Sequence, residues 1–489
     1  MDFSYFNRKA TFQKFDQERY DLIVIGGGIT GAGIALDASL RGLKTALVEK
    51  HDFAYGTSSR STKLIHGGLR YLKQFEFGLV KEVGSERAIV HSLAPHLTVA
   101  EKMLLPLNEG RGMGSLLTSF GLKLYDWLAG VKPADQRRML TRRQTLRAEP
   151  LLKPEDIKGS GLYAEYRTDD ARLTIEVIKT AAVNGVDILN YCEVTNFVYE
   201  NARLPDGQGK IVSVEVRDLL TGDKHGLRGI AVINATGPWV DQLREMDLSK
   251  KGKQLHLTKG VHIVVDRERL PIKQAIYFDV PDGRMIFAIP RGRTTYIGTT
   301  DTDYNGKQEE VVTTKEDAVY LLNAVNETFP AVGLKLEDIE SSWAGLRPLI
   351  HEEGKSASEL SRKDEIFVSD SGLISMAGGK LTGYRKMAER AVDLVIKRSF
   401  EDRKLKKCET NKKKLVGAEF KNAKQVTAYI RLLEKQLKSC GLNHYANYLV
   451  SNYGKQSEII LNYMTQLPDT KDDLALAKSE LWFCIQYEM

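Results

Sequence analysis

The chain has 489 residues, a net charge of +7, and 42% apolar and 28% charged residues, a balance typical of a globular protein with two or three domains. Its four cysteines are scattered without a C-x-x-C pair and its nine histidines show no metal-ligand spacing, so we expect neither a disulfide framework nor a metal site. No stretch approaches the ~18 apolar residues of a membrane span, and the N-terminus lacks the apolar core of a signal peptide, which predicts a cytoplasmic location.

A glycine-rich turn near the N-terminus follows a short apolar run. Residues 21–33 read DLIVIGGGITGAG, in which Gly26, Gly28 and Gly31 satisfy G-x-G-x-x-G between an expected buried strand and an expected helix. In such a turn the first glycine makes the bend, the second lets a pyrophosphate approach the backbone, and the third lets helix and strand pack closely. A second apolar strand ends at Glu49, whose carboxylate can accept hydrogen bonds from ribose hydroxyls. Together these features predict dinucleotide binding.

The nucleotide-binding unit is expected to be interrupted in sequence. We assign to it residues 1–75, 171–240 and 340–397, because the last range contains a further strand, glycine turn and helix. Dehydrogenases that use NAD usually complete this unit without interruption. An interrupted unit with a late glycine segment therefore favours a large flavoprotein.

Further domains are expected around this unit. Residues 76–170 look mainly helical, with apolar residues at helical spacing over 116–128, although that stripe could also dip into a membrane interface. Residues 241–339 alternate in apolar character as antiparallel strands do. We assign both ranges to a second, substrate-binding domain with an antiparallel sheet. The basic, helical residues 398–489 are assigned to a C-terminal helical domain.

Basic residues are concentrated in two segments, with five arginines over 137–147 and seven lysines and arginines over 403–414. Each segment could be a solvated face or linker. Alternatively, each could attract anionic lipid or an anionic substrate. Neither segment carries interleaved aromatic residues or a recognised binding module, so we expect no nucleic-acid partner.

Seven motifs stand in order between about residues 20 and 390: GGGITGAG, TSSRSTKLIHGGLRYL, NATGPWVD, TKGVHIVV, IGTTDTDY, WAGLRPL and AGGKLTGYRKMAE. This series closely resembles the FAD-dependent glycerol-3-phosphate dehydrogenases of the aerobic type and the related α-glycerophosphate oxidases. The resemblance implies an α/β multidomain fold, with a Rossmann-like FAD-binding domain of the glycine/D-amino-acid oxidase type, an antiparallel β substrate domain and a helical C-terminal domain. Because members of the family extend further, the C-terminal domain is expected to be incomplete.

The resemblance also implies a set of cofactor-binding residues. Besides the three glycines and Glu49, they are Thr57, Ser58 and Ser59 near the phosphates, Val194 near the adenine, Gly237 near the diphosphate, and Gly379, Lys380, Leu381 and Thr382 at the flavin ring. A lysine and a helix N-terminus at the last turn would stabilise the negative charge of reduced flavin. The hydroxyl run at 57–59 could instead cap a helix start. No Cys or His lies in a recognisable flavinylation motif, so we expect FAD to be non-covalent.

The implied reaction is oxidation of sn-glycerol 3-phosphate to dihydroxyacetone phosphate, with the C2 hydride passing to flavin N5. The substrate phosphate is best held by arginine forks. The resemblance nominates Arg70 and Arg362 for this role, with Tyr71 as a further donor and Lys380 as a further substrate-binding residue.

Oxidation of a secondary alcohol also requires a base that removes the hydroxyl proton as hydride leaves the carbon. The resemblance implies His262 for this role, because imidazole titrates near physiological pH. A histidine whose hydrogen bonds are satisfied within a sheet is the alternative. Arg347, in the motif GLRPL, is expected to bind the developing alkoxide and the product carbonyl.

The expected electron acceptor is a membrane quinone. The sequence after GLRPL runs on without the long insertion that the oxidases commonly carry, which favours a dehydrogenase over an oxidase that forms H2O2 from O2. A flavin-fold binding protein without catalysis is a further alternative, against which the retained His262, Arg347 and Lys380 argue. Peripheral association with the inner face of the membrane and a homodimer complete the expected partners.

Overall fold

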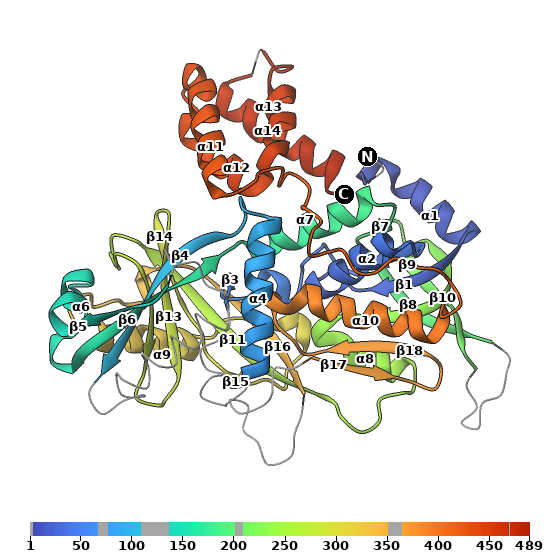
Figure 1. Ribbon diagram of the computed structural model, residues 1–489, viewed down its shortest axis with the longest axis horizontal. Helices are drawn as coiled ribbons and strands as arrows, with labels where there is room; N and C mark the ends of the chain where they lie inside the picture. Colours follow the sequence, from blue (N-terminus) through green and yellow to red (C-terminus); the bar gives the residue numbers. More distant parts are fainter. Residues whose placement is uncertain (1–2, 67–76, 109–135, 201–208, 351–363, 469) are drawn as a thin grey trace.

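The computed structural model describes residues 3–66, 77–108, 136–200, 209–350, 364–468 and 470–489. They form two large sheets that lie side by side and a helical C-terminal region above one end of the first sheet (Figure 1). The N- and C-termini lie close together next to that region (Figure 1). The predicted site residues Arg70, Tyr71 and Arg362 and the apolar stripe at 116–128 lie outside the described residues.

The first sheet contains eight strands within the described residues. Their bounds are β1 (Arg19–Ile25), β2 (Thr45–Val48), β7 (Asp187–Leu189), β8 (Cys192–Tyr199), β9 (Ile211–Asp218), β10 (Lys224–Asn234), β17 (Glu365–Val368) and β18 (Leu373–Ala377). The parallel part has the order β18–β10–β1–β2–β7, and β17 adds antiparallel to β18. Since β1 is covered on both faces, its apolar run is continuous rather than alternating.

Helices cover one face of the first sheet and a ribbon with a helix covers the other. Along β1, Leu22 and Val24 pack with helices α2 (Ile29–Arg41), α7 (Asp170–Val183) and α10 (Tyr384–Ser399). Ile23 and Ile25 pack instead with helix α1 (Arg8–Gln17) and the β8–β9 ribbon. The result is a three-layer unit whose parallel strands end at one edge, where ligands bind in sheets of this kind.

The second sheet contains ten strands within the described residues. Their bounds are β3 (Leu64–Ile65), β4 (Val99–Asn108), β5 (Arg138–Thr141), β6 (Ile157–Arg167), β11 (Leu255–Asp266), β12 (Ala275–Asp279), β13 (Met285–Arg291), β14 (Thr294–Gly298), β15 (Thr302–Asp303) and β16 (Ile339–Ile350). The order is β15–β11–β14–β13–β12–β4–β6–β3, with β16 also paired to β11 and β5 to β6. All these pairs are antiparallel except β12 with β4.

Helix α9 (Lys315–Thr328) packs on one face of the second sheet, against alternate residues of β11. Val261, Ile263 and Val265 are fully buried in the core shared with α9. Successive side chains of a strand point to opposite faces, so His262 lies on the face turned away from that helix. This face looks toward the first sheet and carries the candidate site.

Four helices form the described C-terminal region, namely α11 (Ala423–Leu437), α12 (Ala446–Tyr453), α13 (Ser457–Met464) and α14 (Asp472–Tyr487). They pack around a core of their own. Ion pairs from α7 hold them to the nucleotide-binding unit, since Glu488 accepts from Arg172 at 2.8 Å and from Lys179 at 2.9 Å. The remaining α-helices among the described residues are α4 (Phe77–Leu93), α6 (Arg142–Ala148) and α8 (Val240–Met246).

Two expectations about this arrangement were wrong. In the described part of 76–170, residues 77–108 and 136–170, the chain is not mainly helical, because β4 and β6 form a long antiparallel pair, from Val99 opposite Arg167 to Asn108 opposite Ile157. The boundary at residue 340 is also wrong, since β16 belongs to the second sheet and pairs with β11 along nearly its whole length. Both errors have one cause: the pairing of strands distant in sequence decides these segments, and local periodicity does not report it.

Candidate active site

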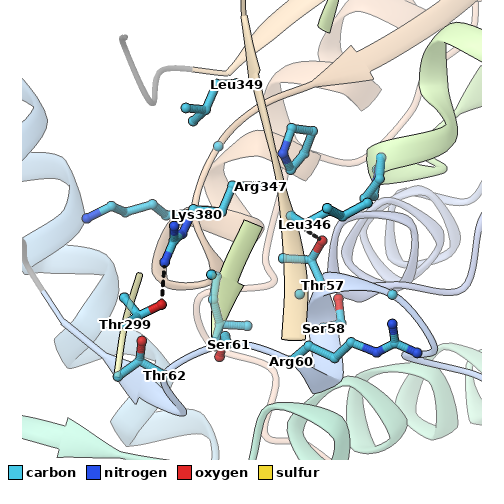
Figure 2. A pocket seen from close by; sticks show the side chains of 18 of the residues that line it. Thr57, Ser58, Arg60, Ser61, Thr62, Thr299, Leu346, Arg347, Leu349 and Lys380 are labelled. Atoms are coloured by element: carbon cyan, nitrogen blue, oxygen red, sulfur yellow. Dashed lines mark hydrogen bonds between the residues drawn. The ribbon is translucent and has the colours of Figure 1, made fainter. Parts of the chain in front are cut away.

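A cavity of about 1020 Å³ lies between the two sheets. Its walls come from the turn between β1 and α2, the loop around η2 (Thr57–Ser59), the ends of β2 and β10, strands β11 and β16, and the turn before α10. Figure 2 shows part of this lining, with Lys380 and Arg347 among the side chains from the later segments. The glycine-rich turn and the predicted catalytic side chains therefore open into one cavity.

The glycines of the first turn have separate structural reasons. Gly26 adopts φ +113° and a Cβ there would lie 2.6 Å from the carbonyl oxygen of Ala235. A Cβ on Gly31 would run into the carbonyl oxygen of Gly26, so this glycine lets α2 pack on the turn without lining the cavity. Gly28 is the N-cap of α2 and lines the cavity, and a Cβ there would meet only Ser58 Oγ at 3.2 Å. The N-terminus of α2 thus faces the cavity, as an anion-binding helix end does.

Glu49 stands at the end of β2 and lines the same cavity. Its Oε2 accepts a hydrogen bond of 2.6 Å from the backbone N–H of Gly27, and its Oε1 accepts one of 2.8 Å from that of His51. Burial raises the pKa of Glu49, while these two N–H groups oppose the rise. The carboxylate therefore holds the glycine turn in place. A ribose hydroxyl that donates to Glu49 would bind an oxygen that already accepts one of these two N–H groups.

The three hydroxyl residues of η2 differ in their placement. Thr57 and Ser58 line the cavity, and Thr57 Oγ1 donates to the carbonyl oxygen of Leu346 at 2.7 Å (Figure 2). Ser58 Oγ accepts from the N–H of Ile29 at 3.0 Å. Ser59 does not line the cavity, because its hydroxyl turns to the carbonyl oxygen of Ala54 at 2.6 Å. The structure thus brings two of these three predicted residues to the site.

Later segments return to the cavity at three places. Val194 lines it from β8, and Gly237 lines it with φ +58° at the start of η5 (Gly237–Trp239), directly after β10. Lys380, Leu381 and Thr382 line it at the turn before α10. In that turn Gly379 has φ +86°, and a Cβ there would collide with the thioether of Met387.

His262 is enclosed by aromatic and hydroxyl groups. Its imidazole stacks on the indole of Trp343, with ring centroids 4.7 Å apart and planes 10° apart. Its Nε2 lies 3.0 Å from Thr62 Oγ1, and its Nδ1 is buried with no hydrogen-bond partner among the described residues. Burial holds the pKa of His262 well below its usual value, and the charges of Arg347 and Lys63 lower it further. The imidazole is therefore neutral at physiological pH and keeps a lone pair.

Arg347 is held in a fixed position by the loop after β14. One guanidinium nitrogen, Nη1, donates to Asp301 Oδ1 at 2.9 Å and to the carbonyl oxygen of Thr300 at 3.0 Å. The other, Nη2, donates to Thr299 Oγ1 at 2.8 Å (Figure 2). The side chain lies over Gly260 of β11, where a Cβ would run into it. Arg347 is thus an oriented cation within the cavity, close enough to His262 to depress the pKa of that imidazole.

Several residues of the site were missed by sequence reasoning. Thr62 and Trp343 touch His262, and Asp301 pairs with Arg347. All three stand inside the motifs quoted above, but nothing in their spacing indicates what they contact. Only the pairing of β16 with β11 brings Trp343 opposite His262.

The site fits a large dinucleotide cofactor. Its volume lies at the upper end of the ~300–1,000 Å³ of ligand pockets. The helix N-terminus at Gly28 suits a diphosphate, and the glycines provide the close approach that such a group requires.

Residues 21–385 match the model of the family described as FAD dependent oxidoreductase (DAO). The chain is 50% identical, over 495 aligned residues, to a protein of Staphylococcus haemolyticus named aerobic glycerol-3-phosphate dehydrogenase, and the alignment covers 100% of this chain and 88% of that protein. The predicted family resemblance is confirmed by these matches.

Solved structures support the same family and fold. The X-ray structure of the glycerol-3-phosphate dehydrogenase from Bacillus halodurans complexed with FAD matches with a TM-score of 0.82 and 44% identity, over 100% of this chain and 86% of that one. A glycine oxidase from Geobacillus kaustophilus shares the fold, with a TM-score of 0.57 and 20% identity over 78% of this chain and 95% of its own. The predicted α/β multidomain fold and the predicted cofactor are confirmed. This chain belongs to the family of FAD-dependent oxidoreductases.

Proposed function

We propose that the chain oxidises sn-glycerol 3-phosphate to dihydroxyacetone phosphate with non-covalent FAD and passes the electrons to a membrane quinone. The observation that carries this proposal is that His262 and Arg347 open into the same cavity as the glycine-rich turn. The names of the relatives at about 50% identity support the substrate. When bound, FAD accepts the hydride that leaves carbon 2.

The proposed cofactor site consists of lining residues, which contact FAD, together with Gly31, which shapes the first turn from outside the cavity. They are Gly26, Gly28, Gly31, Glu49, Thr57, Ser58, Val194, Gly237, Gly379, Lys380, Leu381 and Thr382. Ser59 contributes through the shape of η2, since its side chain bonds to the backbone within the loop.

His262 takes the hydroxyl proton in this proposal. Its neutral imidazole offers a lone pair, and the stack on Trp343 keeps the ring in one orientation. A depressed pKa makes a weak base in the free protein. The negative charge of a bound phosphate would raise that pKa, and loss of hydride in the same step makes the hydroxyl proton more acidic.

Arg347 stabilises the oxygen as the O–H bond breaks. Its guanidinium is fixed by Asp301 and by the loop residues 299–300 before any substrate arrives, so little reorganisation accompanies the charge change. Guanidinium groups stay charged in proteins, so Arg347 does not compete with His262 for the proton.

The substrate phosphate is assigned to Arg70, Tyr71, Arg362 and Lys380. Of these, Lys380 lines the cavity, and the other three lie outside the described residues. Guanidinium forks and an ammonium group are the side chains that bind a phosphate dianion most strongly.

The proposal also covers the electron acceptor and the cellular location of the protein. Among the described residues no helix has the length and hydropathy needed to cross a bilayer. Access to a quinone would then come from attachment to the inner face of the membrane, for which the basic segment 403–414 is the candidate contact with anionic lipid. A homodimer on that surface remains part of the proposal.

The test is an anaerobic titration of the purified flavoprotein. Addition of sn-glycerol 3-phosphate should bleach the visible flavin absorbance, while the same concentration of glycerol should not. Failure to bleach would overturn the substrate assignment. Reoxidation of the bleached protein by a soluble quinone analogue should be much faster than by air; the reverse order would identify an oxidase.

A further inference from the structure

Arg60 is a third arginine among the described residues that line the cavity. It follows η2 directly, and its backbone N–H donates to the carbonyl oxygen of Thr57 at 3.2 Å. Its side chain lies on the same side of the cavity as Thr57 and Ser58 (Figure 2). Strand β16 fixes its backbone from the other side, because a Cβ on Gly345 would lie 2.7 Å from the Cβ and the carbonyl oxygen of Arg60.

The guanidinium of Arg60 has no acidic partner in the part of the chain that the structure describes. It lies over the ring of Tyr55, 5.0 Å from the ring centroid. The other two arginines of the described lining are paired, Arg347 with Asp301 at 2.9 Å and Arg284 with Asp282 at 2.8 Å. A cation that lines a ligand cavity without a counter-charge is a site for a ligand anion.

The carboxylates on this side of the cavity are already engaged elsewhere. Glu49 accepts from two backbone N–H groups of its own turn. Glu193 pairs with Lys50 at 3.1 Å and with Arg217 at 2.6 Å. Among the described residues on this side of the cavity, Arg60 and the N-terminus of α2 are positive features without a paired carboxylate; the first N–H of α2 is held by Ser58, two residues before Arg60.

We propose that Arg60 binds the diphosphate of FAD, as the charged counterpart of the glycine-rich turn. The turn supplies backbone N–H groups and the partial charge of a helix end, and neither provides a full positive charge. An arginine supplies that charge and a planar fork matched to phosphate oxygens. Its guanidinium lies over the ring of Tyr55, and this contact limits the conformational freedom that the side chain would lose on binding.

The test measures release of FAD from the holoenzyme, so it does not depend on the substrate proposed above. FAD dissociation is followed on dilution by the fluorescence of free flavin, for the wild type, Arg60→Ala, Arg60→Lys and the control Arg284→Ala. Arg284 is matched because it also lines the cavity and stacks on a tyrosine, but it is paired with Asp282. Loss of a charge-assisted contact should weaken FAD binding by about 10- to 100-fold in Arg60→Ala.

Further results distinguish the diphosphate from other partners. The Arg60→Lys variant should be intermediate, Arg284→Ala should resemble the wild type, and the salt dependence of FAD binding should be weaker in Arg60→Ala. Riboflavin lacks the phosphates, so its binding should be unaffected by Arg60→Ala. Unchanged FAD dissociation in Arg60→Ala, or equal losses for FAD and riboflavin, would overturn the proposal. A raised KM for glycerol 3-phosphate with unchanged FAD dissociation would overturn it too, and would assign Arg60 to the substrate.

Discussion

At the scale of single residues, two glycines make room for the proposed catalytic side chains. A Cβ on Gly298 would run into the imidazole of His262, and a Cβ on Gly260 would run into the guanidinium of Arg347. Both glycines lie in strands, where glycine is unfavourable unless another group must approach closely. Their presence is thus explained by the two side chains that they accommodate.

The first prediction concerns Gly260. The Gly260→Ala variant should displace Arg347 from Thr299 and lower the rate of flavin reduction by about 10²- to 10³-fold, the usual loss when one charge-stabilising donor is removed. FAD content should not change. The measurement is stopped-flow bleaching under anaerobic conditions. Gly226→Ala is the matched control, because that strand glycine has open space around its Cα and should react like the wild type. Equal rates for both variants would contradict the placement of Arg347.

The second prediction concerns the base. The His262→Ala variant should reduce its flavin about 10²- to 10⁴-fold more slowly, the range expected for a positioned general base. Its FAD content and its affinity for glycerol 3-phosphate should be near those of the wild type, because the nucleotide-binding turn and the phosphate contacts are elsewhere. The rate constant at saturating substrate and the flavin-to-protein ratio check both parts. Near-normal reduction would show that another group accepts the proton.

At the scale of elements, the unit β1–turn–α2 combines a packing requirement with a binding requirement. Gly31 touches the carbonyl oxygen of Gly26, so it serves the packing of helix on strand. Gly28 faces the cavity with only Ser58 nearby, so it serves the ligand. Substitutions at these two positions should therefore fail in different ways.

The third prediction separates those roles. Gly28→Val should give a folded protein that lacks FAD, because its side chain would occupy the approach of the diphosphate to the backbone. Gly31→Val should instead lower the thermal stability of the whole protein, since its side chain would collide with backbone in the turn. The checks are the ratio of visible to ultraviolet absorbance and a thermal unfolding curve. A Gly28→Val variant with a full complement of bound FAD would be inconsistent with the proposed binding mode.

At the scale of the whole molecule, a buried histidine marks the junction between the nucleotide-binding unit and the C-terminal helices. His96 is 1% exposed, and both of its ring nitrogens are buried without a hydrogen-bond partner among the described residues. Its ring lies 6.0 Å from that of Phe420. Burial lowers the pKa of His96 to about 3, helped by the charges of Arg172 and Lys179. Docking of the C-terminal region therefore requires this imidazole to be neutral.

The fourth prediction is a pH dependence of stability. In the unfolded chain His96 gains a proton below about pH 6.5, whereas in the folded protein it stays neutral down to about 3. Below about pH 6.5 the unfolded state therefore binds more protons than the folded state. The free energy of unfolding then decreases as the pH is lowered, by up to ~1.4 kcal/mol per pH unit for this one histidine. Urea unfolding at pH 7 and 5.5 should show a smaller difference for His96→Asn than for the wild type. The exposed control His444→Asn should keep the wild-type difference, and an unchanged difference in His96→Asn would refute the account.

Much of the nucleotide-binding turn could be predicted from local sequence. The run Leu22–Ile25, the glycine spacing and Glu49 lie within 30 residues of one another, and each constrains its neighbours through backbone geometry. The alternation of apolar residues around His262 likewise indicated a strand with one buried face, and α9 covers that face. The seven motifs determined the family, since their order and content are specific.

Tertiary structure decided what those residues touch. Periodicity could not reveal that β4 pairs with β6 or that β16 joins the second sheet, because both pairings depend on partners distant in sequence. Nor could it reveal that Ser59 turns away from the cavity. The low pKa of His262 arises from burial beside Arg347 and Lys63, and burial is a property of the assembled sheets. The sequence by itself determined the turn, the family and the candidate base; packing between distant segments decided their environment and hence their protonation.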